Sequence, residues 1–343
     1  MVSISQRQTA QLAALIKAAG RVAVLGHTHP DGDALGSTSA LGLYLQEVCG
    51  KEVACVFPDS PADNLRFILP PQLRILCLDQ APEQTAAWVS GAQLVFLVDA
   101  NAFSRTEGLA PLLEASTAPK VLIDHHLNPD KEHFQLVFST PDISSASELL
   151  YWILKALKDA PSSADMSIGT ALLTGMTTDT NNFANSVFPS TLQMASELLE
   201  LGVNRDAVLE NIYQRYRENR VRVMGHMQAH ELHVVPGGGA YMILTAAIQQ
   251  RFDLREGETE GLVNVPLSIG DVRLSVLLKE EKDHFRVSVR SKKGTSAQQL
   301  AQRFFHGGGH ENAAGGKLFI GTDIASAADA PAFLEQVLKT FLS

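Results

Sequence analysis

The sequence Val121-Leu122-Ile123-Asp124-His125-His126 is the stretch from which the fold of this chain can be predicted. Its three apolar residues are typical of a short strand that is buried on both faces of a sheet. An aspartate and two histidines follow at the point where that strand would end. Ligands of open α/β sheets bind outside the carboxyl ends of the strands, so these polar residues are candidates for a functional site.

Three other segments, far apart in the sequence, repeat this arrangement of an apolar run followed by acidic or imidazole side chains. They are Arg21–Gly26 leading into His27-Thr28-His29-Pro30-Asp31-Gly32-Asp33, Leu94–Val98 leading into Asp99, and Ala171–Met176 leading toward Asp179. Each run therefore delivers polar side chains just past a buried element. An α/β enzyme assembles one site from several strand ends in this way.

The first half of the chain alternates apolar runs with helical patterns, which predicts a mainly parallel sheet flanked by helices. The expected strands are Val22–Leu25, Val53–Phe57, Leu94–Val98 and Val121–Ile123. A helix is predicted over Ala34–Val48, with Gly50 as its C-terminal cap. Ser145 and Glu148 have the spacing of a capping box before a helix over Leu149–Leu157.

After Ser190 the pattern changes, and a second, smaller α/β domain is expected. Predicted helices over Thr191–Leu201 and Val208–Glu231 would connect the two domains. Strands are expected at Leu232–Val235, Tyr241–Leu244, Val272–Leu278 and Phe285–Val289, the last two joined by a charged turn. We therefore expect a first domain over residues 1–190, a helical connector over 191–231 and a second domain over 232–343.

The composition, with 45% hydrophobic and 19% charged residues, is that of an ordinary globular protein. No apolar run approaches the roughly 20 residues of a membrane-spanning helix, so no membrane partner is expected. Met1–Arg7 lacks the apolar core of a secretory signal, and a cytoplasmic location is expected. The net charge of −9 gives no basic surplus for long nucleic acid. Any nucleic acid that this protein handles should be short and held locally.

The four polar segments together supply the donor atoms of a metal site. The carboxylates belong to Asp31, Asp33, Asp99 and Asp179, and the imidazoles to His27, His125 and His126. Four negative charges balance two divalent cations. The mixture of oxygen and nitrogen ligands favours Mn²⁺ over Mg²⁺, and the absence of cysteine argues against a structural zinc site. Two such ions can share an activated hydroxide for attack on phosphorus.

Each of these residues also has an ordinary structural interpretation. An aspartate at a strand end is often a turn former or a helix N-cap, and Asp33 directly precedes the predicted helix Ala34–Val48. His27 taken alone would be a buried polar residue with a hydrogen-bond partner. His29 is left outside the predicted site because its spacing to Asp31 fits poorly. The coincidence of these candidate ligands in four separate segments favours the metal site.

The stretch Gly307-Gly308-Gly309-His310 has the chemistry of an anion-binding loop. Glycines let the backbone approach an anion closely and turn several N–H groups toward it, and His310 can add a charge-assisted hydrogen bond. Arg290, at the end of a predicted strand, could contact the same anion. A triple glycine is more often a flexible turn, and this alternative stays open. Arg105, beyond Asp99, is a further candidate for binding a substrate phosphate.

These motifs resemble those of the DHH/DHHA1 phosphoesterases, and within them the compact nanoRNase/pAp phosphatase group. The matching residues occur in the family's order over nearly the whole chain: His27, Asp31 and Asp33, then Asp99, Asp124-His125-His126, Asp179, Arg290-Ser291, and Gly307-Gly308-Gly309-His310. The resemblance implies two lobes, a DHH catalytic lobe and a DHHA1 substrate-binding lobe, with the active site in a cleft between them. The assignment to the group rests on chain length and on the absence of extra domains.

The resemblance also implies which residues bind metal and which act on the phosphate. Two Mn²⁺ ions would be bound, the first by His27 and Asp31, the second by Asp33, His125 and Asp179, with Asp99 bridging both. His126 would contact the scissile phosphate or the departing oxygen, and Asp124 would fix the orientation of an imidazole.

In the substrate lobe, the resemblance implies a group of residues that grips the non-scissile phosphate of the terminal nucleotide. These residues are Arg290, Ser291, Gly308, Gly309 and His310. The implied activity is hydrolysis of very short oligoribonucleotides to mononucleotides, and of 3′-phosphoadenosine 5′-phosphate (pAp) to AMP, by a metal-bridging hydroxide.

Several alternatives to this activity remain. A RecJ-like single-strand exonuclease would need an added OB-type domain, and none is left unassigned. Cleavage of linear dinucleotides such as pGpG or pApA stays open, as does a homodimer. A non-catalytic, metal-stabilised nucleotide-binding protein belongs to another class. Burying four carboxylates without a function is costly, and this argues against it.

Overall fold

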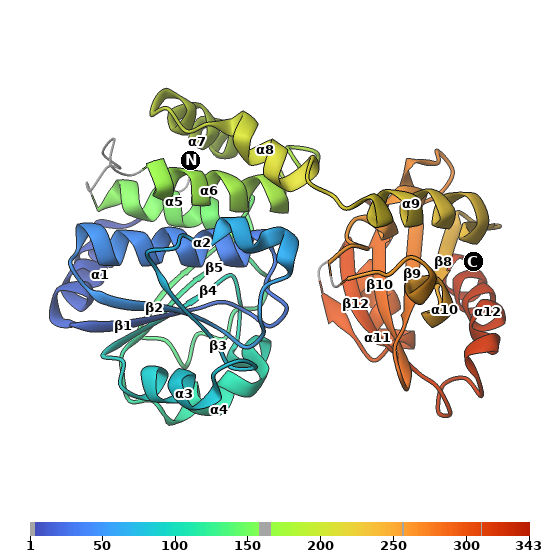
Figure 1. The fold of residues 1–343 in the computed structure, drawn as a ribbon, viewed down its shortest axis with the longest axis horizontal. Helices are drawn as coiled ribbons and strands as arrows, with labels where there is room; N and C mark the ends of the chain where they lie inside the picture. The colour runs from blue at the N-terminus through green and yellow to red at the C-terminus, as the bar shows by residue number, and fades with distance from the viewer. Residues whose placement is uncertain (1–3, 158–165, 256, 310) are drawn as a thin grey trace. The chain divides into compact units, whose positions relative to one another are not determined.

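The computed structural model describes residues 4–157, 166–255, 257–309 and 311–343. The chain divides into two compact units, Met1–Arg215 and Tyr216–Ser343, and each is a sheet with helices on both faces (Figure 1). The two-domain α/β fold predicted from the sequence is confirmed. Among the residues that the structure describes, no helix combines the length and the apolar character needed to span a membrane.

The N-terminal unit is built on a six-stranded sheet in which every neighbouring pair runs parallel. Its strands are β1 (Arg21–Leu25), β2 (Glu52–Phe57), β3 (Arg74–Cys77), β4 (Leu94–Val98), β5 (Lys120–Asp124) and β6 (Leu136–Ser139). Their order is β3-β2-β1-β4-β5-β6. The direction of winding reverses between β1 and β4, which is where open α/β sheets bind their ligands.

Helices cover both faces of this sheet (Figure 1). They are α1 (Gln6–Ala18), α2 (Gly32–Leu43), α3 (Pro82–Ser90), α4 (Ala110–Ala115), α5 (Ala146–Ala156), α6 (Met166–Asp179), α7 (Pro189–Glu200) and α8 (Arg205–Tyr213). One face carries α1, α2, α5 and α6 over an apolar core, with α7 and α8 packed outside them. The other face carries α3 and α4 over a second core. Because both faces are covered, β4 is buried along its whole length.

The start of α2 differs from the expectation for Asp33. The N-cap is Asp31, whose Oδ1 accepts hydrogen bonds from the backbone N–H groups of Asp33 and Ala34, both at 3.0 Å. The side chain of Asp33 is therefore free for another role. The predicted helix Ala34–Val48 is present as α2 followed by a π-helical turn, and Gly50 just beyond it has a φ of 65°.

Glycines allow α2 and α6 to touch through their backbones. A Cβ atom on Gly36 would lie 2.6 Å from the carbonyl oxygen of Ala171 and 2.9 Å from the Cα atom of Gly175. Any larger residue at position 36 would therefore push α6 away from α2. This close approach matters for function because α2 begins beside Asp31 and Asp33.

The capping box predicted at the start of α5 is only half formed. Ser145 is the N-cap, and its Oγ accepts the N–H of Glu148 at 3.0 Å. The carboxylate of Glu148 does not return to the backbone N–H of Ser145 but accepts from other donors, among them Thr191 on α7 at 2.7 Å.

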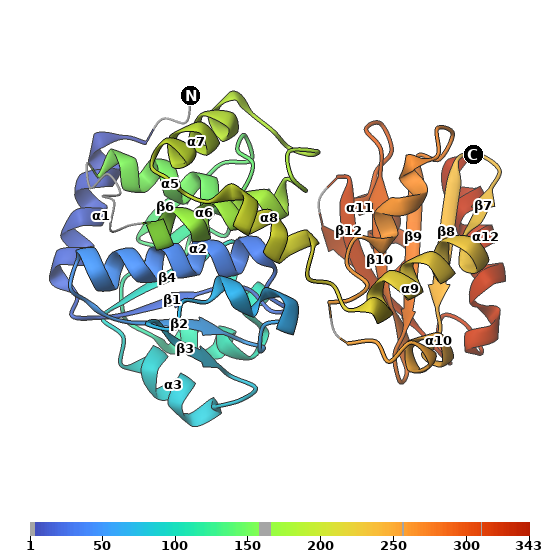
Figure 2. The same ribbon diagram turned by 45° about the horizontal axis from the view of Figure 1, so that its top comes forward.

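The C-terminal unit is built on a six-stranded mixed sheet, with β8 and β9 parallel and the other pairs antiparallel. Its strands are β7 (His233–Val235), β8 (Gly239–Leu244), β9 (Leu274–Glu280), β10 (His284–Ser291), β11 (Gly308–Gly309) and β12 (Ala313–Phe319), and its helices α9 (Glu218–His226), α10 (Ala246–Arg251), α11 (Ala297–Phe304) and α12 (Ala330–Leu342). The strand order is β11-β12-β10-β9-β8-β7. Helices α11 and α12 pack on one face and α9 and α10 on the other (Figure 2).

The predicted helix Val208–Glu231 is wrong as a single element. The chain leaves helical conformation after Tyr213 and re-enters it at Glu218, and α9 continues into a π-helical turn. Arg217 lies in this break, and its guanidinium contacts Asp253 at 2.7 Å and Glu258 at 3.2 Å. These ion pairs join the start of α9 to the rest of the C-terminal unit. The two units divide after Arg215, which lies inside the connector predicted over residues 191–231.

Candidate metal centre

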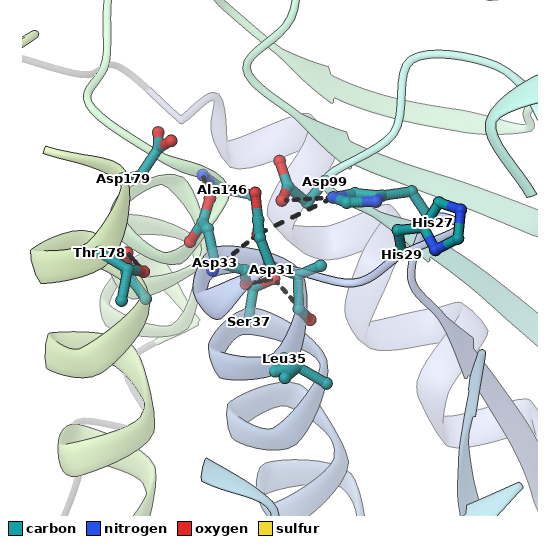
Figure 3. A network of polar contacts seen from close by, with 12 residues as sticks. His27, His29, Asp31, Asp33, Leu35, Ser37, Asp99, Ala146, Thr178 and Asp179 are labelled. Atoms are coloured by element: carbon teal, nitrogen blue, oxygen red, sulfur yellow. Dashed lines mark hydrogen bonds and ion pairs between the residues drawn. The ribbon is translucent and has the colours of Figure 1, made fainter. Parts of the chain in front are cut away.

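Asp99 lies at the centre of a buried cluster where β1, β4 and β5 end (Figure 3). Its side chain is about 3% exposed, and its backbone has a φ of 58°. One carboxylate oxygen lies 3.6 Å from Nε2 of His27, and the other lies 3.3 Å from Nε2 of His125. The strand ends therefore bring an aspartate and two histidines together, as the sequence predicts.

The ring of His27 is oriented so that one nitrogen is left for a ligand. Its Nδ1 lies 2.7 Å from the carbonyl oxygen of Thr28. A carbonyl can only accept, so Nδ1 carries the proton of the neutral ring. Nε2 then faces the carboxylates of Asp31, at 3.8 Å, and Asp99. A neutral imidazole held in this way is suited to bind a metal ion through Nε2.

Three overlapping groups of donor atoms have the spacing of metal sites, with all atoms of a group within 4.8 Å of one another. They are His27, Asp31 and Asp99; Asp33, His125 and Asp179; and Asp99, His125 and His126. All six predicted metal ligands thus fall in these groups. The first two groups are the two ligand sets that the family resemblance implies, and Asp99 lies beside both.

Asp33 and Asp179 enter the cluster from helices. Asp33 is buried in the first turn of α2, and its two oxygens accept the backbone N–H groups of Ala146 and Ser147 at 2.7 and 3.0 Å. Asp179 is the last residue of α6, so the expectation that its apolar run places it at a strand end is wrong. Its Oδ2 nevertheless lies 3.6 Å from Nε2 of His125.

Asp124 and His126 form a pair beside the cluster. Asp124 is completely buried and accepts the backbone N–H of His126 at 3.0 Å and contacts its Nδ1 at 2.7 Å. Because an ionised carboxylate only accepts, this contact places the ring proton on Nδ1 and directs Nε2 away from Asp124. The predicted role of Asp124, to orient an imidazole, is compatible with this geometry.

The crowding of buried carboxylates and imidazoles shifts the pKa values of the cluster. Burial works against a charged His125, but its contacts with Asp99 and the charges of Asp179, Asp99 and Asp33 outweigh burial and raise its pKa to about 10. Burial also raises the pKa of Asp179 to about 7, with neighbouring carboxylates adding to the effect. Burial and the charges of Asp99 and Asp179 raise the pKa of Asp33 well above its usual range. The raised pKa values mean that protons partly neutralise the clustered carboxylates in the protein alone, and bound cations could take the place of these protons.

The donor atoms around Asp99 also fit a divalent metal ion. Oδ1 of Asp99 is buried, and in the described part of the chain it faces the imidazoles of His125 at 3.3 Å and His126 at 3.8 Å. These three side chains form one of the donor groups that have the spacing of a metal site. The donors are carboxylate oxygens and imidazole nitrogens, which suits a divalent ion of the first transition series. The cluster therefore has the composition and geometry of a divalent-metal site.

The loop that follows β1 is held by hydrogen bonds from its backbone to Arg105 and Asp59. Arg105 lies on the 3-10 helix Phe103–Leu109, where its carbonyl accepts the N–H of Thr28 at 2.8 Å, and its role toward substrate stays a prediction. Asp59, which sequence reasoning missed, accepts the N–H of His29 at 2.7 Å. Asp59 follows the end of β2, so the rule that identified the other strand-end residues would have found it. His29 has a largely exposed side chain and belongs to none of the donor groups.

In the C-terminal unit, the end of β10 lies beside the start of β12. Arg290 is partly buried. Burial lowers the pKa of its guanidinium, and the negative charge of Glu260 partly opposes this shift. Ser291 donates its hydroxyl proton to the carbonyl of Thr295 at 2.6 Å and accepts from Asn312 Nδ2 at 3.0 Å. A contact from this hydroxyl proton to a phosphate would therefore require the bond to Thr295 to open.

The three glycines have different surroundings. A Cβ atom on Gly307 would lie 1.9 Å from the carbonyl oxygen of Gly315, and one on Gly309 would lie 2.6 Å from that of Ala313. Gly309 also has a φ of 143°. A Cβ atom on Gly308 would meet nothing within 4 Å. Two of the glycines thus permit close packing against β12, and Gly308 has open space beside it. His310 lies outside the described residues.

Both units match known domains. Residues 21–176 match the DHH family, N-terminal domain, and residues 240–341 match the DHHA1 domain. A protein of Thermus thermophilus named bifunctional oligoribonuclease and PAP phosphatase NrnA is 31% identical over 303 residues, which cover 87% of this chain and 84% of the relative. The chain belongs to the DHH family. The resemblance seen in the sequence motifs is thereby confirmed.

Comparison with solved structures agrees with the assignment of this chain to the DHH family. An exopolyphosphatase-related protein from Bacteroides fragilis matches with a TM-score of 0.91 and 31% identity, over 100% of this chain and 98% of that chain. An exonuclease RecJ bound to manganese matches with a TM-score of 0.57 and 16% identity, over 99% of this chain and 96% of that chain. At this identity the likeness to RecJ is one of fold alone.

Proposed function

We propose that this protein is a metal-dependent phosphoesterase that hydrolyses very short oligoribonucleotides to mononucleotides and converts pAp to AMP. The observation that carries the proposal is the buried cluster around Asp99, whose donor groups hold all the metal ligands that the family motifs imply. The relative named oligoribonuclease and PAP phosphatase, which aligns over most of both chains, supports this choice of substrates. The net charge of −9 agrees with a short substrate that is gripped locally.

The cofactor that we propose is a pair of Mn²⁺ ions, with Mg²⁺ as the alternative. His27, Asp31 and Asp99 would bind one ion, and Asp33, His125, Asp179 and Asp99 the other. Bound cations of this kind polarise phosphoryl oxygens, lower the pKa of a coordinated water and offset charge on the leaving oxygen. Mixed nitrogen and oxygen ligands support Mn²⁺, because Mg²⁺ prefers oxygen ligands and retained water.

The chain's own residues would then orient the reacting groups. Asp124 orients the ring of His126 by two contacts, and we infer that the charged ring would donate a proton from Nε2 to the departing oxygen. The backbone N–H groups of Ala146 and Ser147 hold Asp33 in a single orientation. Side chains fixed in this way hold donors in place without reorganisation during the reaction.

We infer that the DHHA1 domain binds the non-scissile phosphate of the substrate. Arg290 carries a partly buried guanidinium that could pair with a phosphate, and Gly308 leaves its backbone accessible to an anion. Binding of this phosphate would fix its distance from the bond that is cleaved, and this would limit the enzyme to short substrates. A shared cleft, a cytoplasmic location and a homodimer stay predictions.

The test is an assay of the purified full chain on labelled RNA from dinucleotides to longer oligomers, on pAp, on pGpG and on long single-stranded DNA. We expect mononucleotides from the shortest RNAs and AMP from pAp with Mn²⁺, and no turnover after the metal has been removed by a chelator. Readdition of Mn²⁺ should restore activity. Processive degradation of long DNA would favour a RecJ-like exonuclease, and binding without turnover would favour a non-catalytic protein.

Substitutions in the glycine stretch separate anion binding from folding. Gly308→Ala adds a methyl group in open space, so we expect a normal melting temperature but a weaker contact with the anchored phosphate. The backbone N–H is kept, but the methyl group would hold the phosphate further from it. Losing that hydrogen bond to a charged group corresponds to a loss of roughly tenfold to a hundredfold in kcat/KM on pAp.

Gly307→Ala serves as the contrast, because its methyl group would collide with the backbone of Gly315. This variant should lose thermal stability as well as activity. A generic aryl phosphodiester, which lacks the second phosphate, should be hydrolysed normally by Gly308→Ala. Equal losses by this variant on pAp and the aryl ester would argue against an anchoring role for the stretch.

A further inference from the structure

The side chain of Asp33 is held by the start of α5, far from it in the sequence. Its Oδ2 accepts the N–H of Ala146 at 2.7 Å (Figure 3). Its Oδ1 accepts the N–H of Ser147 at 3.0 Å. The first N–H groups of a helix have no partner within the helix, and here two of them are used on one carboxylate. Each oxygen keeps a further lone pair, so Asp33 can bind a cation at the same time.

Helix α6 encloses the same carboxylate from another direction. A Cβ atom on Gly175 would lie 2.8 Å from Oδ1 of Asp33 and 2.1 Å from Oγ of Ser147. The space around Asp33 is therefore filled on both sides. Its orientation depends on the position of the first turn of α5, because that turn supplies both hydrogen bonds.

The first turn of α5 is fixed by a buried carboxylate, Glu148. Its Oε2 accepts the N–H of Ser144 at 3.1 Å, the hydroxyl of Ser144, and the hydroxyl of Thr191 at 2.7 Å. Its Oε1 accepts Nε1 of Trp152 at 3.3 Å. The side chain is completely buried, and within the described ranges no lysine, arginine or histidine forms an ion pair with it.

The four donors come from different parts of the structure. Ser144 precedes the N-cap, Trp152 lies one turn further along α5, and Thr191 belongs to α7. An ionised carboxylate is the side chain that can accept from all four without offering a proton of its own. Burying such a group without a basic partner is costly, so a neutral residue would be the cheaper choice if only packing were needed.

We propose that Glu148 is a positioning residue of the metal centre. It fixes the start of α5, and through the N–H groups of Ala146 and Ser147 it holds Asp33 in the orientation that binds a cation together with His125 and Asp179. This inference rests on the proposed metal centre but assigns a role to a residue that contacts neither metal nor substrate.

The test is titration of the metal-free full chain with Mn²⁺ in a calorimeter, for the wild type and Glu148→Gln. Glutamine has nearly the same size but keeps one acceptor oxygen and turns an N–H₂ group toward the other donors. Residues that orient metal ligands change metal affinity by roughly tenfold to a hundredfold when they are replaced, and we expect a loss of this size at one of the sites.

Glu197→Gln is the matched control. Glu197 joins the same two helices, α5 and α7, by contacts to Tyr151 and to Lys155 at 2.5 Å. These contacts lie away from the start of α5, so the control should lower the metal-free melting temperature without changing Mn²⁺ affinity. A purely structural role for Glu148 would give the same result as this control.

The outcomes separate the inference from the proposed function. If the wild type takes up no Mn²⁺, the metal centre itself is wrong. If the wild type binds Mn²⁺ and Glu148→Gln binds it equally well, only the positioning role is overturned. Should Glu148→Gln fail to fold, Ser144→Ala decides the question, since it removes a single donor hydroxyl. We expect it to weaken Mn²⁺ binding about fivefold, and unchanged affinity would overturn the inference.

Discussion

Replacing Asp99 with asparagine is expected to abolish hydrolysis and to lower the number of Mn²⁺ ions that the protein binds. Asp99 belongs to two of the three donor groups, and its two oxygens face the imidazoles of His27 and His125. Removing its charge would disturb both proposed ions at once. Loss of a residue central to catalysis costs on the order of 10⁴-fold in kcat.

Asparagine is the suitable replacement because Asp99 has a φ of 58°. Asparagine adopts this left-handed conformation more readily than alanine, so the backbone should be retained. Metal content after gel filtration and kcat/KM on pAp would be measured together. Asp130→Asn is the matched control, because Asp130 contacts His133 at 2.7 Å outside the donor groups and should be dispensable. Near-normal turnover by Asp99→Asn would remove Asp99 from its bridging role.

The residues that follow strands could be predicted from the sequence, for a physical reason. Leu94–Val98 and Val121–Ile123 are apolar along their length because both faces of a parallel sheet are covered. Polar residues directly after such runs must lie at the carboxyl edge of the sheet. The sequence alone therefore predicts that Asp99 and His125 lie close together.

The contributions of helices were harder to predict. Asp179 has the same sequence pattern as Asp99, but its apolar run belongs to the helix α6, since a short apolar run does not distinguish a buried helix from a buried strand. The sequence also does not show that Asp31, and not Asp33, is the N-cap of α2. Both residues lie at the start of the helix. The structure shows that Asp31 caps α2, whereas the side chain of Asp33 accepts a hydrogen bond from the first turn of α5.

Backbone donors carry no signal in the sequence. The N–H groups of Ala146 and Ser147 hold Asp33, yet alanine and serine are common at the start of any helix. The glycine stretch shows the same limit. Its sequence allowed both an anion-binding loop and a tight turn, and only the distances to Gly315 and Ala313 separate Gly307 and Gly309 from Gly308.

Replacing His126 with alanine is the second large effect that we expect. If Nε2 of His126 donates a proton to the departing oxygen, its loss should lower kcat by about 10²–10⁴-fold. The bound metal should stay unchanged, because the six proposed ligands are intact. His126 also lies in a donor group with Asp99 and His125. A fall in metal content for His126→Ala would therefore identify it as a ligand instead.

Asp124→Asn tests whether the two residues act as a unit. The carboxylate of Asp124 contacts Nδ1 of His126 at 2.7 Å, and an amide in its place could also donate, which would allow the ring to change tautomer. We expect a loss in kcat that approaches that of His126→Ala. In the double variant the two losses should not add, because Asp124 would act only through His126. Additive losses would show that Asp124 supports the centre by a separate route, for example through the backbone of His126, whose N–H it also holds.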